Sequence, residues 1–195
     1  MIRAGRENGT EFRPLFPHGA ARQKEKRIME FENKDYKVFE LFNKRWALAT
    51  AGVEGDYNTC TIGWGSLGSI WHGEHGAMPI ATIYIHPDRY TLEFLQKYDH
   101  FTVSFFGEEY RPALSYLGSH SGRDGDKVSA AGLTPVPMGE SVTFREAELS
   151  FLCKKLYGAQ FRRECFAPEI NEGIYKNWEP HWMFIGGITE VDDRR

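Results

Sequence analysis

The sequence predicts a mainly β protein, a β-barrel with peripheral α-helices, from three observations. Several segments alternate apolar and polar residues with the period of a half-buried strand. Helical segments are inserted between some of these strands, whereas a parallel sheet would alternate strand and helix regularly. Aromatic residues, which strands favour, make up 14% of the 195-residue chain. This length suits one domain and is too short for two comfortable ones.

The expected strands lie along the whole chain from residue 46 onward. The clearest one carries Phe101, Val103 and Phe105 at every second position. Such alternation places one face on a core and leaves the other for a ligand or partner. An amphipathic stretch at 33–42 precedes the strands, and a turn at 54–56 separates the first two. The strands are expected at 46–52, 58–64, 79–86, 100–106, 143–157 and 181–191.

Three helices are expected, at 88–98, 108–117 and 127–131. The first follows Pro87, and Asp88 or Thr91 is expected to cap it. Apolar residues recur in this segment at helical spacing. Gly118 and Gly132 are expected to end the other two helices, which a polar loop at 119–126 connects.

A glycine-rich segment carries two motifs that its surroundings argue against. Residues 63–68 match the G-x-G-x-x-G pattern of dinucleotide-binding folds, but Gly73 and Gly76 follow where that pattern needs a helix. Residues 72–75 read His-Gly-Glu-His, and a metal site of this kind also needs a helix to align its two histidines. A surface turn is expected at 72–75 instead.

Composition argues against several classes of function. The net charge of −3 does not suit nucleic-acid binding, which relies on many cationic contacts. No apolar run is long enough to span a membrane, and the N-terminus lacks the apolar core of a signal peptide, so a cytoplasmic protein is expected. Cys60, Cys153 and Cys165 form no C-x-x-C pair and are expected to be buried or incidental thiols, with no metal bound.

The first 28 residues differ from the rest of the chain. They lack apolar periodicity and carry a charged run at 22–27, which is typical of a disordered basic extension. The codons for this run can be purine-rich, as a ribosome-binding site is. A second hypothesis is therefore that translation starts at Met29 and that residues 1–28 are not made in the cell; a nucleic-acid-binding arm is the third. The domain itself is expected at 29–195.

Three segments, in their order and spacing, resemble the flavin-reductase-like family of FMN-binding split β-barrels. They are NTCTIGWGS at 58–66, PDRYTLEFL at 87–95 followed by the strand at 101–106, and LGSHSGRDGDK at 117–127. The closing strand at 181–188 is similar to the last barrel strand of the family. The resemblance runs from about Met29 to the C-terminus. It implies an FMN-binding split β-barrel with peripheral helices, usually a homodimer with the flavin near the interface.

The resemblance also implies a flavin site, residue by residue. The flavin ring and ribityl chain would be lined by Thr61, Ile62, Gly63, Trp64, Gly65 and Ser66. The phosphate would lie at the helix start formed by Arg89, Tyr90 and Thr91. Main-chain partners for the pyrimidine edge would come from Ser104 and Phe105. The site would be closed by Ser121, Gly122, Arg123, Asp124 and Lys127, with Lys127 as the charged contact, and His181 or Trp182 would reach a ring from the partner subunit.

The residues themselves support part of this site and leave alternatives open. A helix start favours an anion, Arg89 offers a planar fork to phosphate, and Thr91 offers a hydroxyl. The alternative is a solvated Arg89 and a plain helix cap at Thr91. Small residues at 61–68 allow close approach to a flat ring, although a barrel corner needs the same glycines. Trp64 either stacks on the ring or packs in the core, and 121–124 is otherwise an exposed turn.

The expected function is NAD(P)H-dependent flavin reduction, with electrons passed to a small-molecule or protein acceptor. The flavin carries the chemistry, so no nucleophile triad or carboxylate pair is required. A non-catalytic flavin carrier or electron-transfer module would share every binding residue. An activity like that of pyridoxamine-phosphate oxidase would need a further basic pocket, which Arg162 and Arg163 are the candidates to supply.

Overall fold

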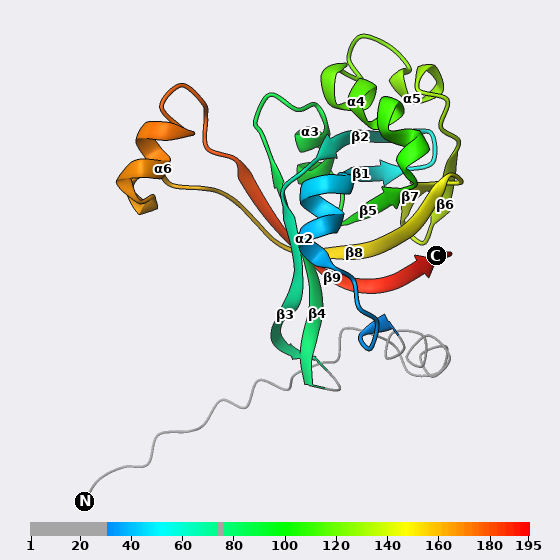
Figure 1. The fold of residues 1–195 in the computed structure, drawn as a ribbon, viewed down its shortest axis with the longest axis horizontal. Helices are drawn as coiled ribbons and strands as arrows, with labels where there is room; N and C mark the ends of the chain where they lie inside the picture. The colour runs from blue at the N-terminus through cyan, green and yellow to red at the C-terminus, as the bar shows by residue number, and fades with distance from the viewer. Residues whose placement is uncertain (1–30, 74–75) are drawn as a thin grey trace, which may run out of the picture.

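The computed structural model describes residues 31–73 and 76–195. In this part of the chain, seven strands form one antiparallel sheet in the order β2-β1-β5-β8-β9-β4-β3, and two more form the hairpin β6-β7 (Figure 1). The mainly β prediction is confirmed. The strands are β1 (Ala47–Val53), β2 (Asp56–Ile62), β3 (Gly65–Gly73), β4 (Gly76–Ile85), β5 (His100–Phe106), β6 (Pro135–Met138), β7 (Ser141–Phe144), β8 (Ala147–Gln160) and β9 (Trp182–Asp193).

The two longest strands, β8 and β9, bend the sheet around its core. Their pairing register shifts twice, between Leu152 and Cys153 and between Lys155 and Tyr157. Shifts of this kind bend a strand and increase its twist. Fully buried phenylalanines fill the interior, and Phe105 and Phe151 meet there edge to face with ring centroids 6.4 Å apart. Aromatic alternation along the strands therefore builds the core that the sequence predicted.

The helices are short and lie at the periphery. They are α2 (Val38–Glu40), continued by the π-helical turn η1 (Leu41–Arg45), then α3 (Thr91–Lys97), η2 (Glu108–Tyr110), α4 (Arg111–Ser119), α5 (Lys127–Ala130), η3 (Arg163–Cys165) and α6 (Pro168–Gly173). In Figure 1, α4 and α5 lie together above the sheet, and α6 lies in the connection between β8 and β9, to the side of the barrel. No helix among the described residues is long and apolar enough to cross a membrane.

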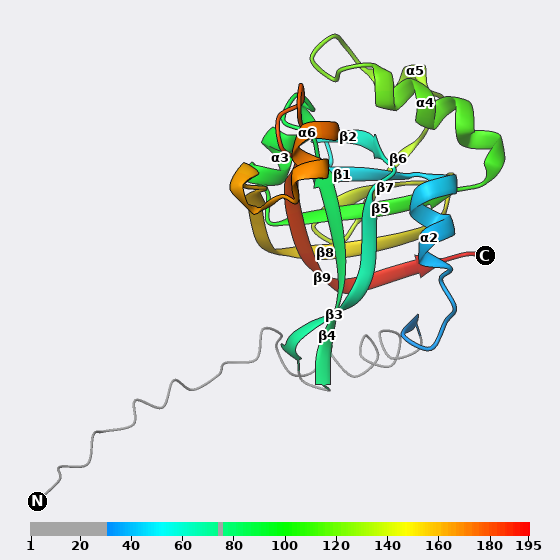
Figure 2. The same ribbon diagram turned by 60° about the vertical axis from the view of Figure 1, so that its left-hand side comes forward.

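Strand β3 and the first part of β4 occupy a segment for which the sequence predicted no strand. They pair from Gly65 with Ile83 to Gly73 with Gly76 and extend away from the barrel as an arm (Figures 1 and 2). The sequence did not predict this strand because β3 is a sheet edge: residues 65–67 are only partly buried and 68–72 are exposed, so no fully buried face imposes alternation. The rejection of a dinucleotide-binding helix at 63–68 is confirmed. Of the expected turn at 72–75, Glu74 and His75 lie outside the described residues, as does the extension at 1–28.

Two further expectations need correction. The single strand expected at 143–157 is interrupted, because β7 ends at Phe144 and β8 begins at Ala147. Helix α3 has Tyr90 at its N-cap and no side-chain cap there, so capping by Asp88 or Thr91 is wrong. Thr91 is buried and instead donates its hydroxyl hydrogen bond to Asn58 Oδ1 across 2.8 Å.

The opposite end of α3 is capped from another strand. Lys155 Nζ donates to the carbonyl oxygens of Leu95 and Tyr98, each at 2.7 Å, and to that of Gln96 at 3.2 Å. The last carbonyls of a helix lack partners of their own and carry partial negative charge, which an ammonium group satisfies. Lys155 thus attaches the C-terminal end of α3 to β8.

Candidate functional site

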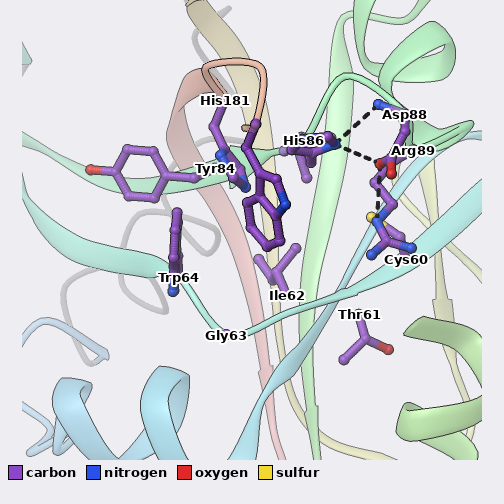
Figure 3. A pocket seen from close by; sticks show the side chains of 12 residues that line it. Cys60, Thr61, Ile62, Gly63, Trp64, Tyr84, His86, Asp88, Arg89 and His181 are labelled. Carbon is purple, nitrogen blue, oxygen red and sulfur yellow. Dashed lines mark hydrogen bonds and ion pairs between the residues drawn. The ribbon is translucent and has the colours of Figure 1, made fainter. Parts of the chain in front are cut away.

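A cavity of about 360 Å³ lies where β2 and β4 end, beside the turn before α3 and the connection from β8 to β9 (Figure 3). Strand β2 supplies one wall and runs into residues 63–64. Strand β4 supplies a second wall and runs into the turn at 86–89. The lining residues are Cys60, Thr61, Ile62, Gly63, Trp64, Tyr84, Ile85, His86, Asp88, Arg89, Trp178 and His181.

Close packing behind the wall explains the glycines at the end of β2. A Cβ atom on Gly65 would lie 2.2 Å from the ring of Phe42, which is buried. A Cβ atom on Gly63 would lie 3.4 Å from the ring of Trp46. The ring of Phe42 therefore requires glycine at position 65, whereas the contact at Gly63 is an ordinary van der Waals distance. This supports the interpretation of the segment as a barrel corner that needs glycine, at Gly65.

Three polar residues of the turn at 86–89 contact one another at the second wall. His86 Nδ1 lies 2.8 Å from Asp88 Oδ1, and Arg89 Nε lies 3.5 Å from the same oxygen (Figure 3). Arg89 also donates from Nη1 to the carbonyl oxygen of Gly118 at 2.7 Å, which joins the turn to the end of α4. The lining of the cavity thus carries one guanidinium group, with a carboxylate beside it.

His181 lies against the same wall and is buried. Its Nδ1 is 3.2 Å from the hydroxyl of Tyr175, and its ring centroid is 4.7 Å from that of Trp64 and 5.1 Å from that of His86. Burial, and next the neighbouring His86, lower the pKa of His181 to about 4. Burial raises the pKa of Tyr175, so its hydroxyl stays protonated. The low pKa makes His181 neutral near pH 7, with a hydrogen bond between Nδ1 and the Tyr175 hydroxyl.

His86 contributes an unpaired polar atom. Within the described residues its Nε2 is buried and has no hydrogen-bond partner. The ring of Trp178 packs edge to face against the imidazole at 5.4 Å between centroids. Buried polar atoms in folded proteins are nearly always paired, so an unpaired one at a cavity wall indicates a place for a ligand atom.

The structure gathers part of the predicted flavin site around this cavity. Six of the predicted residues line it: Thr61, Ile62, Gly63, Trp64, Arg89 and His181. Gly65 and Ser66 follow on β3, outside the lining. Trp64 is exposed at the cavity, so the alternative in which it packs in the core is wrong. His181 reaches the cavity of its own chain, whereas Trp182 stacks on Phe184.

Ser104 and Phe105 lie away from the cavity and are fully buried. The hydroxyl of Ser104 forms a closed triangle with those of Thr143 and Ser150, at 2.9, 2.7 and 3.1 Å. The face of β5 that alternation left free for a ligand is thus covered by the β6-β7 hairpin. Alternation in the sequence marks two faces but cannot say what covers each.

The loop predicted to close the site packs on the start of α3. Arg123 pairs with Glu93, and its guanidinium lies 4.4 Å from the ring centroid of Tyr90. A Cβ atom on Gly122 would lie 2.0 Å from Asn58 Nδ2, so the loop lies tightly against β2. Ser121 accepts a hydrogen bond from the main-chain N–H of Arg123, and Asp124 donates its own N–H to the carbonyl of Ser121.

Lys127 is held behind this loop and does not line the cavity. Its Nζ donates to the carbonyl oxygens of Leu117 at 3.2 Å and His120 at 3.0 Å, and burial lowers its pKa. The ammonium group therefore caps the end of α4. Asp126 caps α5, accepting from the N–H groups of Val128 and Ser129.

Sequence reasoning missed half of the lining. The missed residues are Cys60, Tyr84, Ile85, His86, Asp88 and Trp178. A usable signal was present for two of them, since His86 and Asp88 flank a proline directly after an apolar strand, and polar residues at strand ends are often functional. Trp178 comes from a distant connection, and no local pattern marks it.

The fold and the cavity together define the class of protein. It is a small single-domain antiparallel β-barrel whose ligand site lies at the ends of two strands. Residues 41–194 match the family model of the flavin reductase like domain, and the chain belongs to this family. Most members of the family are oxidoreductases. A search of curated proteins finds no significant match.

Solved structures share the fold. An FMN-binding protein from Thermus thermophilus with bound 1-cyclohex-2-enone is 23% identical over 76% of this chain and 70% of its own, with a TM-score of 0.58. Flavoredoxin from Methanosarcina acetivorans is 19% identical over 76% and 68%, with a TM-score of 0.58. The NADH:FAD oxidoreductase SgcE6 of Streptomyces globisporus C-1027 is 15% identical over 76% and 74%, with a TM-score of 0.57. The predicted split-barrel fold is confirmed.

Proposed function

We propose that this protein binds FMN in the cavity between β2 and β4 and uses it as an NAD(P)H-dependent oxidoreductase. The observation that carries the proposal is the lining itself, in a member of the flavin reductase like family: aromatic walls, one guanidinium group and an unpaired imidazole nitrogen. The similar structures include an FMN-binding protein and an NADH:FAD oxidoreductase. These relatives support both the cofactor and the nicotinamide donor as proposals for this chain.

The residues present fit a flavin. Trp64, Tyr84 and Trp178 offer flat apolar surfaces of the kind that pack against a conjugated ring. Arg89 is the cation of the lining and has guanidinium N–H groups beyond the one bound to Gly118, so it suits the phosphate. The carboxylate of Asp88 lies beside Arg89 and partly opposes the binding of an anion there. The hydroxyl of Thr91 is engaged by Asn58 and is not part of this phosphate site.

Bound FMN would supply the hydride chemistry, and the protein would supply position and surroundings. Arg89 would hold the phosphate end, while Thr61 and Gly63 at the end of β2 would face the cofactor. The neutral His181, whose Nδ1 is engaged by Tyr175, would offer Nε2 for a hydrogen bond with the flavin ring. Trp64 and Trp178 would keep water away from the reacting face.

Two measurements on the purified holoprotein test the proposal. Its absorption spectrum should show the bands of oxidised flavin, and the fluorescence of added FMN should report saturable binding if the flavin is lost during purification. NADH or NADPH added under argon should then bleach the yellow colour. A colourless protein that binds no FMN contradicts the cofactor. Binding without bleaching by either nucleotide would instead favour the flavin carrier.

Arg162 and Arg163 do not form the basic pocket that an activity like that of pyridoxamine-phosphate oxidase would need. Arg163 is occupied by the connection it belongs to, donating to Asn171 Oδ1 at 3.2 Å and to the carbonyls of Tyr175 and Trp178 at 2.7 Å. Arg162 pairs with Glu164 at 3.6 Å and is exposed. Neither lines the cavity.

We also propose a homodimer, formed with the arm of β3 and β4. Strand β3 is an edge of the described sheet, and Ile70 and Trp71 on it are 38% and 48% exposed. Open edges with apolar side chains favour pairing with another chain. Light scattering after gel filtration should give a dimer mass for the protein and a monomer mass for Trp71→Glu. Phe39→Glu is the control, because Phe39 is exposed on α2, outside the arm.

A further inference from the structure

The two ring nitrogens of His86 have different surroundings. Nδ1 is engaged within its own turn, 2.8 Å from Asp88 Oδ1 and 3.3 Å from the main-chain nitrogen of Asp88. Nε2 is buried and, among the residues that the structure describes, has no hydrogen-bond partner. Leaving a buried polar atom unpaired costs free energy, so a ligand that pairs with it gains affinity. His86 thus offers one polar contact to a molecule in the cavity.

Two rings pack against His86, one buried and one exposed. The ring of His181 lies 5.1 Å away between centroids, and it is buried and shares a hydrogen bond with Tyr175. The ring of Trp178 lies 5.4 Å away, and Trp178 is 53% exposed, so its indole can move off His86 without opening the core. Its main chain stays in place because Arg163 Nη2 donates to its carbonyl oxygen at 2.7 Å. Movement of the indole alone therefore gives a cavity ligand access to Nε2.

The position of Arg89 limits which part of FMN can reach His86. Arg89 Nε lies 3.5 Å from Asp88 Oδ1, the same oxygen that His86 Nδ1 contacts (Figure 3). The guanidinium and the imidazole are thus neighbours on one carboxylate. With the phosphate of FMN on Arg89, His86 meets the part of the molecule nearest to the phosphate. In FMN that part is the ribityl chain, whose polar atoms are hydroxyl groups.

We propose that His86 is a binding residue that recognises the ribityl hydroxyl groups of FMN through Nε2. The inference rests on the proposed binding of FMN with its phosphate on Arg89. It adds the residue that distinguishes a hydroxylated chain from a plain alkyl chain. A hydroxyl group both donates and accepts, so it pairs with Nε2 whether or not that nitrogen carries a proton. The contact therefore requires no change in the protonation of His86.

The two hydroxyl-bearing side chains of the lining, Thr61 and Tyr84, are placed less well for this role. Thr61 donates its hydroxyl hydrogen bond to the carbonyl oxygen of Leu114 at 2.5 Å, so its proton is already used. Tyr84 extends away from Arg89 (Figure 3). A site with a buried polar atom discriminates against an analogue that lacks the matching group, because the atom is then left unpaired. Nε2 of His86 is the atom of the lining that meets this condition.

Two flavins and two variants test the proposal by fluorescence titration. The ligands are FMN and 5′-phosphopentyl flavin, which keeps the ring and the phosphate but has a plain alkyl chain. Asparagine places a polar atom near the position of Nδ1, whereas glutamine places one near that of Nε2. His86→Asn should therefore weaken FMN binding roughly tenfold and leave that of phosphopentyl flavin within about twofold. His86→Gln should keep FMN binding within about threefold.

His100→Asn is the matched control, because His100 Nδ1 also lies 2.8 Å from a carboxylate, that of Glu140, outside the cavity lining. This variant should bind both flavins as the unchanged protein does. Equal weakening of both flavins in His86→Asn would overturn the proposal, since the effect would then lie at the phosphate or in the fold. Unchanged binding of both flavins would overturn it as well.

Nitrogen-15 spectra of the unchanged protein give a second readout, which does not depend on the folding of a variant. The Nε2 signal of His86 should move further when FMN is added than when phosphopentyl flavin is added, because FMN alone brings hydroxyl groups. Equal movement with the two flavins contradicts the proposal. Failure of the unchanged protein to bind either flavin removes the proposed function itself, and it is seen before any variant is compared.

Discussion

Thr91 donates its hydroxyl hydrogen bond to Asn58 Oδ1 across 2.8 Å, and both side chains are buried. The bond joins the first residue of α3 to the middle of β2. It therefore fixes the turn that carries His86, Asp88 and Arg89 relative to the strand that runs into the cavity wall. The hydroxyl that the family resemblance assigned to the flavin phosphate is engaged in holding the site together.

Thr91→Val should destabilise the fold and leave flavin affinity unchanged. The substitution keeps the shape but leaves Asn58 Oδ1 buried without its donor, which costs about 1–3 kcal/mol. Urea unfolding of the flavin-free protein measures the loss, and Thr91→Ser, which keeps the hydroxyl, is the control. A large fall in FMN affinity with unchanged stability would show instead that Thr91 contacts the flavin phosphate.

Arg89→Ala should weaken FMN binding by about 1.5–3 kcal/mol, the scale of a hydrogen bond to a charged group, which is roughly a tenfold to 150-fold rise in Kd. Fluorescence titration with FMN measures it. Arg123→Ala is the matched control, because Arg123 pairs with Glu93 outside the cavity lining. Equal losses in the two variants would show that the effect comes from general charge and not from a contact at Arg89.

The sequence predicted the strands with a buried aromatic face, because burial imposes the alternation that can be read. It failed at β3, whose edge position imposes no pattern, and at the interruption between Phe144 and Ala147. For the cavity lining, the family resemblance pointed to Arg89 and to the end of β2. Alternation also did not reveal that a hairpin covers the second face of β5, where the hydroxyl of Ser104 is bound. The sequence missed Trp178, which reaches the cavity from a distant connection.

Gly65→Ala should destabilise the protein by about 1–3 kcal/mol through overpacking. The new methyl group would lie 2.2 Å from the ring of Phe42, which is buried and pairs edge to face with Phe105 at 5.2 Å. The ring cannot retreat without disturbing the core. Gly68→Ala, on the same strand, is the control, because no heavy atom lies within 4 Å of its Cβ position. Similar urea midpoints for both variants would contradict the role given to Phe42.

The burial of His181 should make stability depend on pH below neutrality. Its pKa is about 4 in the folded chain, against an ordinary value of 6.5 for an unburied histidine, so between these values the unfolded chain binds a proton that the folded chain does not. The free energy of unfolding should therefore fall as pH falls from about 6.5 to about 4, by up to roughly 3 kcal/mol from this residue. The charged and titratable groups that face His181 are His86, Asp88, Arg89 and Tyr175.

His181→Gln isolates this contribution, because glutamine keeps a polar side chain that does not titrate. Urea unfolding of the flavin-free protein at pH 7 and pH 5 should show a smaller loss of stability for the variant than for the unchanged protein. His100→Gln, which removes a histidine outside the cavity lining, should retain the loss attributed to His181. If His181→Gln and the unchanged protein lose equal stability, His181 is charged in the folded state, and the neutral imidazole assigned to the cavity wall is wrong.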